Sequence, residues 1–417
     1  MLHVDKLDSM MTEPISITAT ALEPESTYEI FLRLNHFMGT LYGNGVYKAD
    51  NHGRINFKTR PPLRGTYSGI RQMGLFESLT PCEDFRFGNY CKCTPPNPFN
   101  FVLELRDCSG NVLHSLPIVK RWCHPSVTRT EIEEGGICGT LFKPPGDGPF
   151  PTILDMSGTG GGINEHKGAT LASEGFCVLS LAFFQYKNLV EDLNDLDIGY
   201  FKKAIDWLVS QSFASKEIGI EGVSFGGLVV NMLAVRHPEI IAVCSINGSH
   251  ALTDIAKIKE GGEFLPYAAP PVNMLYYINS TMCYNKAIQF MDVSADADIH
   301  IENAPKRTAF RFVGSLDDLS TPTVFVSRLY EKKLKESGHY VEVDFAPGGH
   351  LMEPPFFPSQ PVVYSKFAGC MQAYGGEPSL HGASQPRVWR NTVAFFKRFL
   401  GNTKPLPDYR EQLQSHL

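Results

Sequence analysis

Ser224 lies at the centre of the stretch Gly222-Val223-Ser224-Phe225-Gly226, which matches the pattern G-x-S-x-G. An apolar run precedes it from residue 218, and a helix-like run over 227–235 follows it. In this context the pattern is typical of a nucleophile elbow, where a serine occupies a sharp turn between a strand and a helix. Residues next to such a turn must lack bulk, which accounts for the glycines. We expect Ser224 to be a nucleophile, although a chain with 37 glycines can also meet the pattern by chance.

A serine hydroxyl needs a general base, and the chain order that goes with this elbow is serine, acid, histidine. His350 is the preferred base because it follows the strand-like run 340–345 in a glycine-containing loop. The alternatives are His250, His300 and His339, each of which would otherwise be a surface or capping histidine.

The acid should follow the preceding strand, and the run 308–318 ends in two aspartates, Asp317 and Asp318. One carboxylate is enough to hold the imidazole tautomer and to stabilise the imidazolium. We prefer Asp317 as this acid. Asp318 remains the alternative, and the other aspartate would be a solvated loop carboxylate.

A glycine-rich loop over 157–162, SGTGGG, directly follows the strand-like run 151–156. Backbone N–H groups of such a loop can hold an oxyanion together with the N–H of the residue after the nucleophile. We expect Phe225, Thr159 and Gly160 to supply these donors. The loop lacks the ending of a P-loop and does not fit a dinucleotide fingerprint. No metal-ligand spacing occurs in the chain, so we expect no metal and no cofactor.

Elements that could position these residues begin near residue 136, where strand-like and helix-like runs alternate. The run 197–211 places Phe201, Ala204, Ile205 and Leu208 on one helical face. Such alternation predicts a mostly parallel, doubly wound sheet, whose function gathers at the carboxyl ends of the strands.

Residues 1–135 show a different pattern, with short β-branched or alternating runs and no long helical period. The segment 46–57 is read as two strands around an Asn- and Gly-containing turn, and 101–119 repeats this pattern. We therefore predict an all-β sandwich domain over 1–135 and an α/β domain over 136–417.

The net charge, the cysteines and the apolar runs indicate which partners and compartments to expect. The net charge of −6 gives no indication of a nucleic-acid partner or of an anionic membrane surface. The ten cysteines are scattered, which favours a reduced intracellular compartment. No apolar run reaches membrane-spanning length, and the first residues lack a secretory apolar region. The tripeptide Ser415-His416-Leu417 is one basic residue away from the peroxisomal address S-K-L, so we expect a peroxisomal import receptor as a partner.

Several longer sequence strings identify a protein family more specifically than the short G-x-S-x-G pattern does. They include TYSGIRQMGLFESLTP in the first domain, and SGTGGGINEHKGATLASEGF, SINGS, GGHLMEPPFFP and YGGEP in the second. Over nearly the whole chain these strings resemble the acyl-CoA thioesterase / bile acid-CoA:amino acid N-acyltransferase family. The resemblance implies an immunoglobulin-like domain packed on an α/β-hydrolase domain. It also implies a triad of Ser224, His350 and one aspartate, and ungapped counting from Val313-Gly314 favours Asp317.

The sequence departs from the family pattern in the spacing of the acidic pair in VGSLDD, which leaves the alignment of the aspartate ambiguous by one residue, and in three further places. Phe225 follows the nucleophile where many relatives are expected to have lysine, and Glu221 stands in the strand where an apolar residue is usual. The Cys- and Pro-rich segment 82–98 departs as well. The departures at Phe225 and Glu221 could alter substrate preference, and neither removes the triad.

The activity implied by the resemblance is hydrolysis of fatty acyl-CoA to a free fatty acid and CoA. The nearest alternative is N-acyl transfer to glycine or taurine. Family members with that activity resemble cysteine enzymes, whose acyl intermediate resists water, so serine at 224 favours hydrolysis. A general carboxylesterase and a non-catalytic acyl-CoA or lipid-binding protein are further alternatives.

Two expectations concern the CoA arm and the location. Lys167, Lys187 and Arg236 lie near motif loops and are candidates for contacts to CoA phosphates, although each could be an ordinary surface charge. Because relatives include peroxisomal members, we expect a peroxisomal location, and otherwise a cytoplasmic one.

Overall fold

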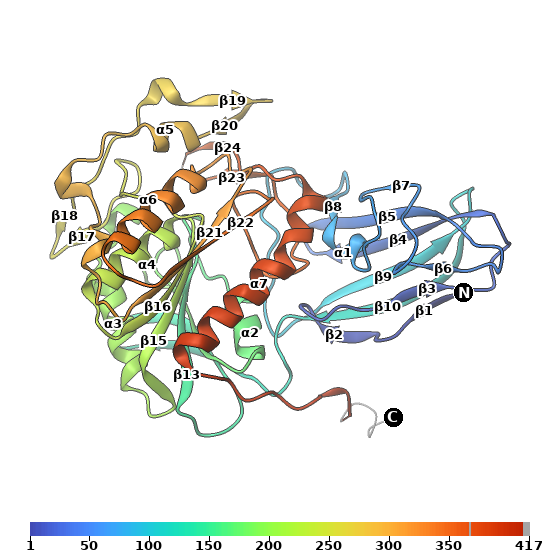
Figure 1. Cartoon of the computed structure of the whole chain (residues 1–417), viewed down its shortest axis with the longest axis horizontal. Coiled ribbons are helices and arrows are strands. Elements are labelled where there is room, and N and C mark those ends of the chain that lie inside the picture. Colours follow the sequence, from blue (N-terminus) through green and yellow to red (C-terminus); the bar gives the residue numbers. More distant parts are fainter. Residues whose placement is uncertain (367, 412–417) are drawn as a thin grey trace.

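The computed structural model describes residues 1–366 and 368–411. The predicted import signal, Ser415-His416-Leu417, lies outside the described residues and stays a prediction. Figure 1 shows a β-rich N-terminal part beside a larger part in which helices cover a sheet. Among the described residues, no helix combines the length and the apolar character that crossing a membrane requires.

The N-terminal part is built from two sheets that share one apolar core. The larger sheet has the strand order β2-β10-β9-β4-β5-β7, with β8 paired to β5, and the smaller has the order β1-β3-β6. Ile17 and Ile55 from the smaller sheet and Leu32 and Leu103 from the larger one belong to the same buried cluster. The strands are β1 (Leu2–Val4), β2 (Asp8–Met10), β3 (Ile17–Ala19), β4 (Thr27–His36), β5 (Gly39–Lys48), β6 (Ile55–Asn56), β7 (Arg64–Gly65), β8 (Thr80–Pro81), β9 (Phe99–Arg106) and β10 (Val112–Arg121), with the short helix α1 (Gly74–Glu77).

The pairing of these strands agrees with the sequence in one place and differs in another. β9 and β10 form the antiparallel hairpin predicted over 101–119. The two strands expected within 46–57 exist, but they join different sheets, because β5 pairs with β4 and β6 pairs with β3.

The second part contains a sheet with the order β11-β12-β14-β13-β15-β16-β21-β22. Its pairs from β14 onward are parallel, and β12 is antiparallel to both of its neighbours. The strands are β11 (Thr128–Glu134), β12 (Ile137–Lys143), β13 (Phe150–Met156), β14 (Cys177–Ala182), β15 (Ala214–Val223), β16 (Ile240–Ile246), β21 (Ala309–Ser315) and β22 (Val341–Ala346). Because β11 pairs with β12, the structural boundary between the two parts lies before Thr128, a few residues ahead of the predicted position 135.

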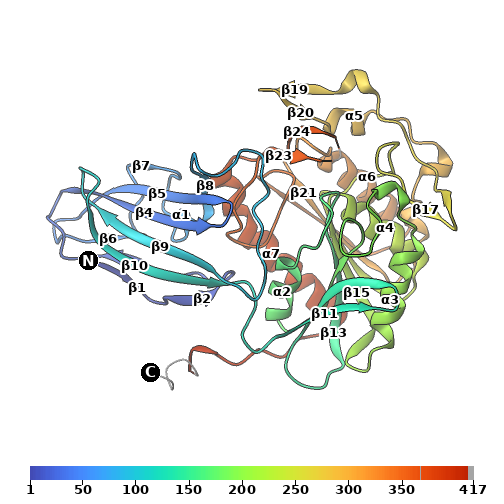
Figure 2. The ribbon, with the colours of Figure 1, turned by 180° about the vertical axis from the view of Figure 1, so that it is seen from behind.

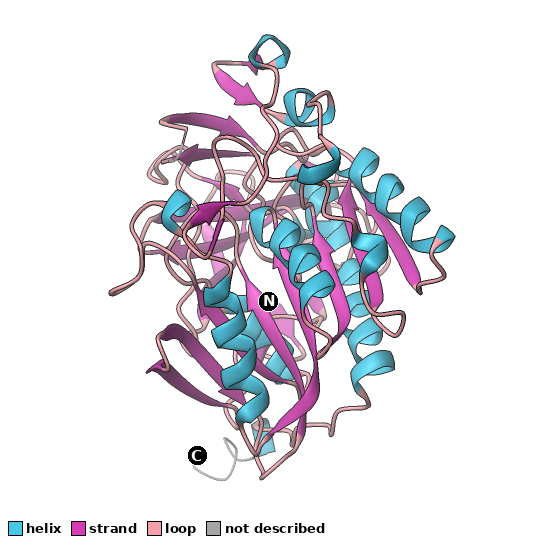
Figure 3. Cartoon of the chain, turned by 90° about the vertical axis from the view of Figure 1, so that its left-hand side faces the viewer, coloured by secondary structure: helices cyan, strands magenta, loops and turns pink. Residues whose placement is uncertain are grey.

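Helices cover both faces of this sheet, as Figures 2 and 3 show. The residues of α3 (Gly199–Ser210), α4 (Phe225–Arg236) and α6 (Thr323–Glu336) pack into one buried cluster on one face. Residues of α2 (His166–Ser173) and α7 (Pro378–Leu400) pack into another cluster on the opposite face. A mostly parallel sheet covered in this way, with a strand–serine–helix turn at its edge, is the expected α/β-hydrolase fold.

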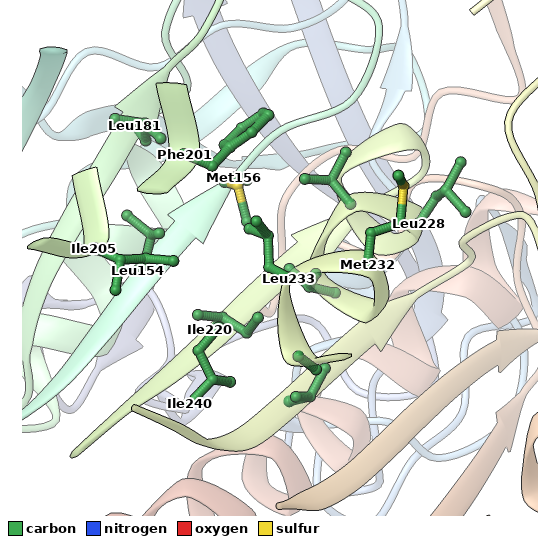
Figure 4. Close-up of a cluster of buried hydrophobic side chains, with 14 of the residues drawn as sticks. Leu154, Met156, Leu181, Phe201, Ile205, Ile220, Leu228, Met232, Leu233 and Ile240 are labelled. Atoms are coloured by element: carbon green, nitrogen blue, oxygen red, sulfur yellow. The ribbon is translucent and has the colours of Figure 1, made fainter. Parts of the chain in front are cut away.

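The core between α3, α4 and the sheet fixes the strand and the helix that flank Ser224. Figure 4 shows Ile220 of β15 beside Leu233 of α4, with Phe201 and Ile205 of α3 nearby. The four residues predicted for one face of α3 are its buried residues, so this prediction is confirmed. Each fully buried side chain of this size contributes about 1.5–3 kcal/mol relative to exposure in water.

Smaller elements lie over the edge of the sheet at which β15, β16 and β21 end (Figure 1). A small sheet of order β19-β20-β24-β23 combines segments from two insertions, one before β21 and one after β22. The elements are β17 (Lys259–Glu260), β18 (Glu263–Phe264), β19 (Tyr276–Ile278), β20 (Thr281–Cys283), α5 (Asn285–Gln289), β23 (Val362–Ser365) and β24 (Cys370–Ala373), with 3₁₀ turns at Leu193–Asp195, Val272–Met274, Ala295–Ala297 and Ile301–Asn303.

The two parts of the chain also share a core. Phe356 and Phe357, which follow His350 along the chain, belong to the buried cluster of the N-terminal part. The Phe356 ring packs edge-on against Phe76, with ring centroids 6.2 Å apart. The segment after His350 is therefore held by both parts.

Candidate active site

Ser224 occupies a strained turn between β15 and α4. Its backbone has φ of 60° and ψ of −120°, a conformation that costs a non-glycine residue free energy. A Cβ at Gly222 would lie 2.3 Å from the carbonyl oxygen of Gly226, and one at Gly226 would lie 2.4 Å from the carbonyl oxygen of Ser157. The glycines of the G-x-S-x-G pattern are thus required by close backbone contacts, as a nucleophile elbow demands.

The side chain of Ser224 is hydrogen-bonded to His350. Ser224 Oγ lies 2.7 Å from His350 Nε2, and His350 Nδ1 lies 2.8 Å from Asp318 Oδ2. The side chains of His350 and Asp318 are each only 1% exposed. A carboxylate can only accept, so Nδ1 carries the proton and Nε2 is free to accept from the serine hydroxyl.

The acid in this chain of hydrogen bonds is Asp318, and the preference for Asp317 was wrong as to position. Asp318 Oδ1 accepts from the backbone N–H groups of Ser320 and Thr321, both at 2.8 Å, which turns Oδ2 toward His350. Asp317 is exposed, and its Oδ2 accepts from the N–H of Gly376 at 2.9 Å. Asp317 therefore fastens a neighbouring loop and does not contact the imidazole.

The other candidate histidines have partners elsewhere. His250 packs edge-on against Phe325, and burial lowers its pKa to about 4, so it is neutral. His300 is hydrogen-bonded to Glu302 and to the carbonyl of Ala295. His339 is hydrogen-bonded to Ser337 and to the carbonyl of Ala304.

The glycine-rich loop after β13 lies against the elbow. A Cβ at Gly158 would lie 2.9 Å from Ser224 Cβ, so the loop and the serine are in contact. Thr159 lines both pockets that open at Ser224, and Gly160 lines one of them. Phe225 is the first residue of α4, and its N–H therefore has no acceptor within the helix. The donors expected from the sequence are thus close to Ser224, and their role as an oxyanion hole stays a prediction.

Two pockets meet at Ser224 and differ in character. The first spans about 670 Å³, part of which is open to solvent, and none of the described residues that line it is charged. Its apolar wall is formed by Phe225, Leu228, Ala251, Ile255, Ala256, Met282 and Ile288. The second pocket spans about 1280 Å³, part of which is open to solvent, and polar and apolar atoms contribute about equally to its lining. We call it the polar pocket because the charged residues Lys92, Lys366 and Glu353 line it.

The second pocket runs between the two parts of the chain. The N-terminal part contributes the segment 88–90, Met38 and Lys92, and the second part contributes the glycine-rich loop among others. Tyr90 also donates to Glu353 Oε1 at 2.9 Å, which ties the 88–92 segment to the hydrolase domain.

Glu353 lies in a buried group of charges beneath this pocket. His166 Nε2 is 2.9 Å from Glu353 Oε2, and Lys167 Nζ is 3.6 Å from the same oxygen. Burial alone would raise the pKa of Glu353, but the charges of Lys167 and His166 hold that pKa well below its usual range. Glu353 is therefore paired with Lys167 and His166 within this buried group.

The lysines and the arginine proposed for CoA contacts are engaged elsewhere. Lys167 is buried between Glu353 and Glu221, and Lys187 pairs with Glu131 and Glu133. Arg236 pairs with Glu260. None of the three is among the described residues that line a pocket at Ser224. Lys92 and Lys366 do line one, and neither could be identified from the sequence because both lie in loops without a motif.

The expectation that no metal or cofactor is needed stays a prediction. Among residues 1–366 and 368–411, no cluster of three His, Cys, Asp or Glu side chains has the arrangement of a metal site.

Comparison with known proteins decides the family. Residues 12–134 match the family described as "Acyl-CoA thioester hydrolase/BAAT N-terminal region", and residues 196–402 match "BAAT / Acyl-CoA thioester hydrolase C terminal". The chain is 31% identical over 404 residues to acyl-coenzyme A amino acid N-acyltransferase 1 of Mus musculus, covering 94% of this chain and 96% of that protein. The chain belongs to this family.

A thioesterase of the same species is similar to this chain to a comparable extent. The peroxisomal succinyl-coenzyme A thioesterase of Mus musculus is 30% identical, with 95% of each chain covered. Among solved structures, the acylaminoacyl peptidase of Pyrococcus horikoshii aligns with a TM-score of 0.45 at 13% identity, covering 96% of this chain and 61% of that one. The family models and these two relatives confirm the predicted membership of the acyl-CoA thioesterase / bile acid-CoA:amino acid N-acyltransferase family, and with it an enzyme.

The departures from the expected family pattern have clear places in the structure. The Phe225 side chain is buried, lies 6.2 Å from Phe183 between ring centroids and lines the uncharged pocket. Glu221 is buried with its Oε1 3.7 Å from Lys167 Nζ. Phe225 thus adds apolar surface next to the serine, whereas Glu221 belongs to the charged group beneath the polar pocket.

Proposed function

We propose that this protein hydrolyses acyl-CoA thioesters to a free acid and CoA through Ser224, His350 and Asp318. The observation that carries the proposal is the hydrogen-bonded chain of these three side chains at the junction of an uncharged pocket and a polar one. An acyl-CoA would match these two pockets, because its apolar acyl chain and its polar, anionic CoA arm join at the thioester.

In the first step Ser224 Oγ attacks the thioester carbonyl carbon while His350 Nε2 takes the hydroxyl proton. Asp318 stabilises the resulting imidazolium through Nδ1. The N–H of Phe225 and one N–H of the 157–162 loop would hold the negative oxygen. The C–S bond then breaks, and the departing CoA sulfur takes the proton from His350 Nε2, which returns the imidazole to its neutral form.

In the second step His350 activates a water molecule, which attacks the acyl-serine carbonyl. The ester bond to Ser224 Oγ breaks, the serine regains its proton from His350, and the free acid departs. The acyl chain would lie in the uncharged pocket. The CoA arm would lie in the polar pocket, with Lys92 and Lys366 near its phosphates, since lysines are suited to bind phosphate groups.

N-acyl transfer to an amino acid is the second candidate, favoured by the similarity to an N-acyltransferase of Mus musculus. In that reaction an amine would replace water in the second step. A serine ester is a less persistent intermediate toward water than the family's cysteine thioester is expected to be, so we place hydrolysis first.

The test is product analysis with a series of acyl-CoAs, with and without glycine or taurine, using wild type, Ser224→Ala and Ser249→Ala. Ser249 also lines the uncharged pocket, where its hydroxyl contacts the carbonyl of Ala251, and it serves as the matched control. We expect free acid from wild type and Ser249→Ala, none from Ser224→Ala, and no effect of the amine. Acyl-glycine or acyl-taurine would identify a transferase. Binding without turnover would identify a non-catalytic binding protein, and turnover of simple esters alone would identify a carboxylesterase.

We also propose a peroxisomal location. Support comes from the similarity to the peroxisomal succinyl-coenzyme A thioesterase of Mus musculus, at 30% identity. Fractionation of cells that contain the native protein tests the proposal: enrichment with a peroxisomal marker is expected, and recovery with a cytosolic marker would contradict it.

A further inference from the structure

Asn247 lies directly after β16 and contacts the loops that carry the acid and the histidine. It is 1% exposed and has a left-handed backbone, with φ of 51°. It belongs to the string SINGS, which has no role in the chemistry described above. Asn247 is also absent from the described residues that line the two pockets at Ser224.

The carboxamide of Asn247 forms hydrogen bonds through both its oxygen and its nitrogen. Its Oδ1 accepts from the backbone N–H of Ser315 at 2.9 Å. Its Nδ2 donates to Ser315 Oγ at 2.9 Å and to the carbonyl oxygen of His350 at 2.6 Å. Since the Ser315 N–H can only donate and the His350 carbonyl can only accept, the orientation of the amide is fixed. Among side chains of this shape, only a carboxamide satisfies both partners.

These contacts join the three triad segments at one point. Ser315 is the last residue of β21 and precedes the loop that carries Asp318. The neighbouring Ile246 accepts, through its carbonyl, the backbone N–H of Ser224 at 2.8 Å. The residues 246–247 therefore contact the nucleophile turn, the acid loop and the histidine main chain.

We propose that Asn247 is a positioning residue, which sets the place of the His350 imidazole relative to Ser224 and Asp318. The proposal rests on the proposed function of this triad. A displacement of reacting groups by about 1 Å can cost about 10²-fold in rate. Loss of Asn247 should therefore lower kcat by about 10²-fold and change KM little, because the pockets stay intact.

The test uses Asn247→Gly, since glycine accepts the left-handed backbone and removes the amide without adding strain. Thr308→Val is the matched control. Thr308 is fully buried and its Oγ1 donates to the carbonyl of Ile240 at 2.9 Å, so it links the same two strands at their opposite ends. Asn247→Asp is the second variant, which keeps the shape and the acceptor but removes the donor to the His350 carbonyl.

Two readouts are needed besides the melting temperature. The first is kcat and KM with an acyl-CoA. The second is the rate at which a fluorophosphonate labels Ser224, which reports on the activated serine with no CoA ester present. We expect both Asn247 variants to lose about 10²-fold in kcat and in labelling rate, and Thr308→Val to keep at least half of each.

The proposal would be overturned if either folded Asn247 variant kept kcat and labelling rate within twofold of wild type and lost only as much melting temperature as the control. A raised KM with unchanged labelling would overturn it as well. If wild type is labelled at Ser224 but does not release CoA, the proposed substrate is wrong while the labelling rates still test the role of Asn247.

Discussion

Replacing Asp318 by asparagine should nearly abolish turnover, whereas the same change at Asp317 should not. In Asp318→Asn the oxygen that accepts from Ser320 and Thr321 is retained, so the new NH₂ group takes the place of Oδ2. That group donates to His350 Nδ1, which moves the imidazole proton to Nε2. His350 then cannot accept the proton of Ser224.

The size of the effect follows from the loss of the correct tautomer with the geometry kept. Such a change costs about 10³–10⁴ in kcat, which corresponds to about 4–5.5 kcal/mol of transition-state stabilisation. Asp317→Asn is the matched control, because an amide oxygen can still accept from the N–H of Gly376. We expect its kcat to stay within about twofold of wild type.

The assay is release of CoA thiol, followed by a chromogenic disulfide, with kcat and KM measured for both variants and melting temperatures recorded beside them. A loss of 10²-fold or more in Asp317→Asn, with most of the activity kept in Asp318→Asn, would contradict the assignment of Asp318 as the triad acid. A large loss in both variants with wild-type melting temperatures would also refute it, since the two carboxylates would then act together.

Three further changes test other parts of the structure. Gly222→Ala should abolish Ser224 labelling and lower the melting temperature, because its Cβ would lie 2.3 Å from the carbonyl oxygen of Gly226; wild-type labelling would contradict the strained turn. Burial raises the pKa of Glu221, so the native state binds the extra proton and stability falls as pH rises above the ordinary glutamate range. The melting temperature of Glu221→Gln minus that of wild type should therefore increase from pH 5 to pH 8. A difference that stays constant over this range would exclude a raised pKa of Glu221. Burial lowers the pKa of Lys120 to about 7, so the unfolded chain binds more protons and wild-type stability rises with pH from about 7 toward 10. Lys120→Met should lack this rise in melting temperature, and parallel curves for the two proteins would disprove the assignment.

The parts of the fold that could be predicted are those with a regular apolar period. The face of α3 formed by Phe201, Ala204, Ile205 and Leu208 is one such case, and the strand and helix around Ser224 are another. α7 was not predicted, because Gly382 and Pro386 interrupt its helical pattern. Glycine is required at position 382 by a tertiary contact, because a Cβ there would lie 1.9 Å from the carbonyl oxygen of Glu77 in the N-terminal part.

The site was predictable to the extent that motifs mark it. Ser224 and His350 follow from the elbow and from chain order, and the structure brings them together. The choice between Asp317 and Asp318 depends on a local turn, since the N–H groups of Ser320 and Thr321 orient only the second carboxylate. Sequence spacing does not reveal that turn.

The residues around the polar pocket lacked even a local signal. Lys92 and Lys366 lie far apart in the chain and reach one pocket only through the packing of the two domains. Asn247 had a visible motif, but its contacts to Ser315 and His350 depend on strand order in the sheet.

The placement of Phe356 and Phe357 in the core of the N-terminal domain has a consequence for modularity. A catalytic domain produced alone would leave both rings in water and would release the segment that follows His350. An N-terminal domain taken from a relative must contain a cavity in its core that fits these two rings. The two domains therefore have to be exchanged or redesigned together, even though each has the outline of an independent module (Figure 1).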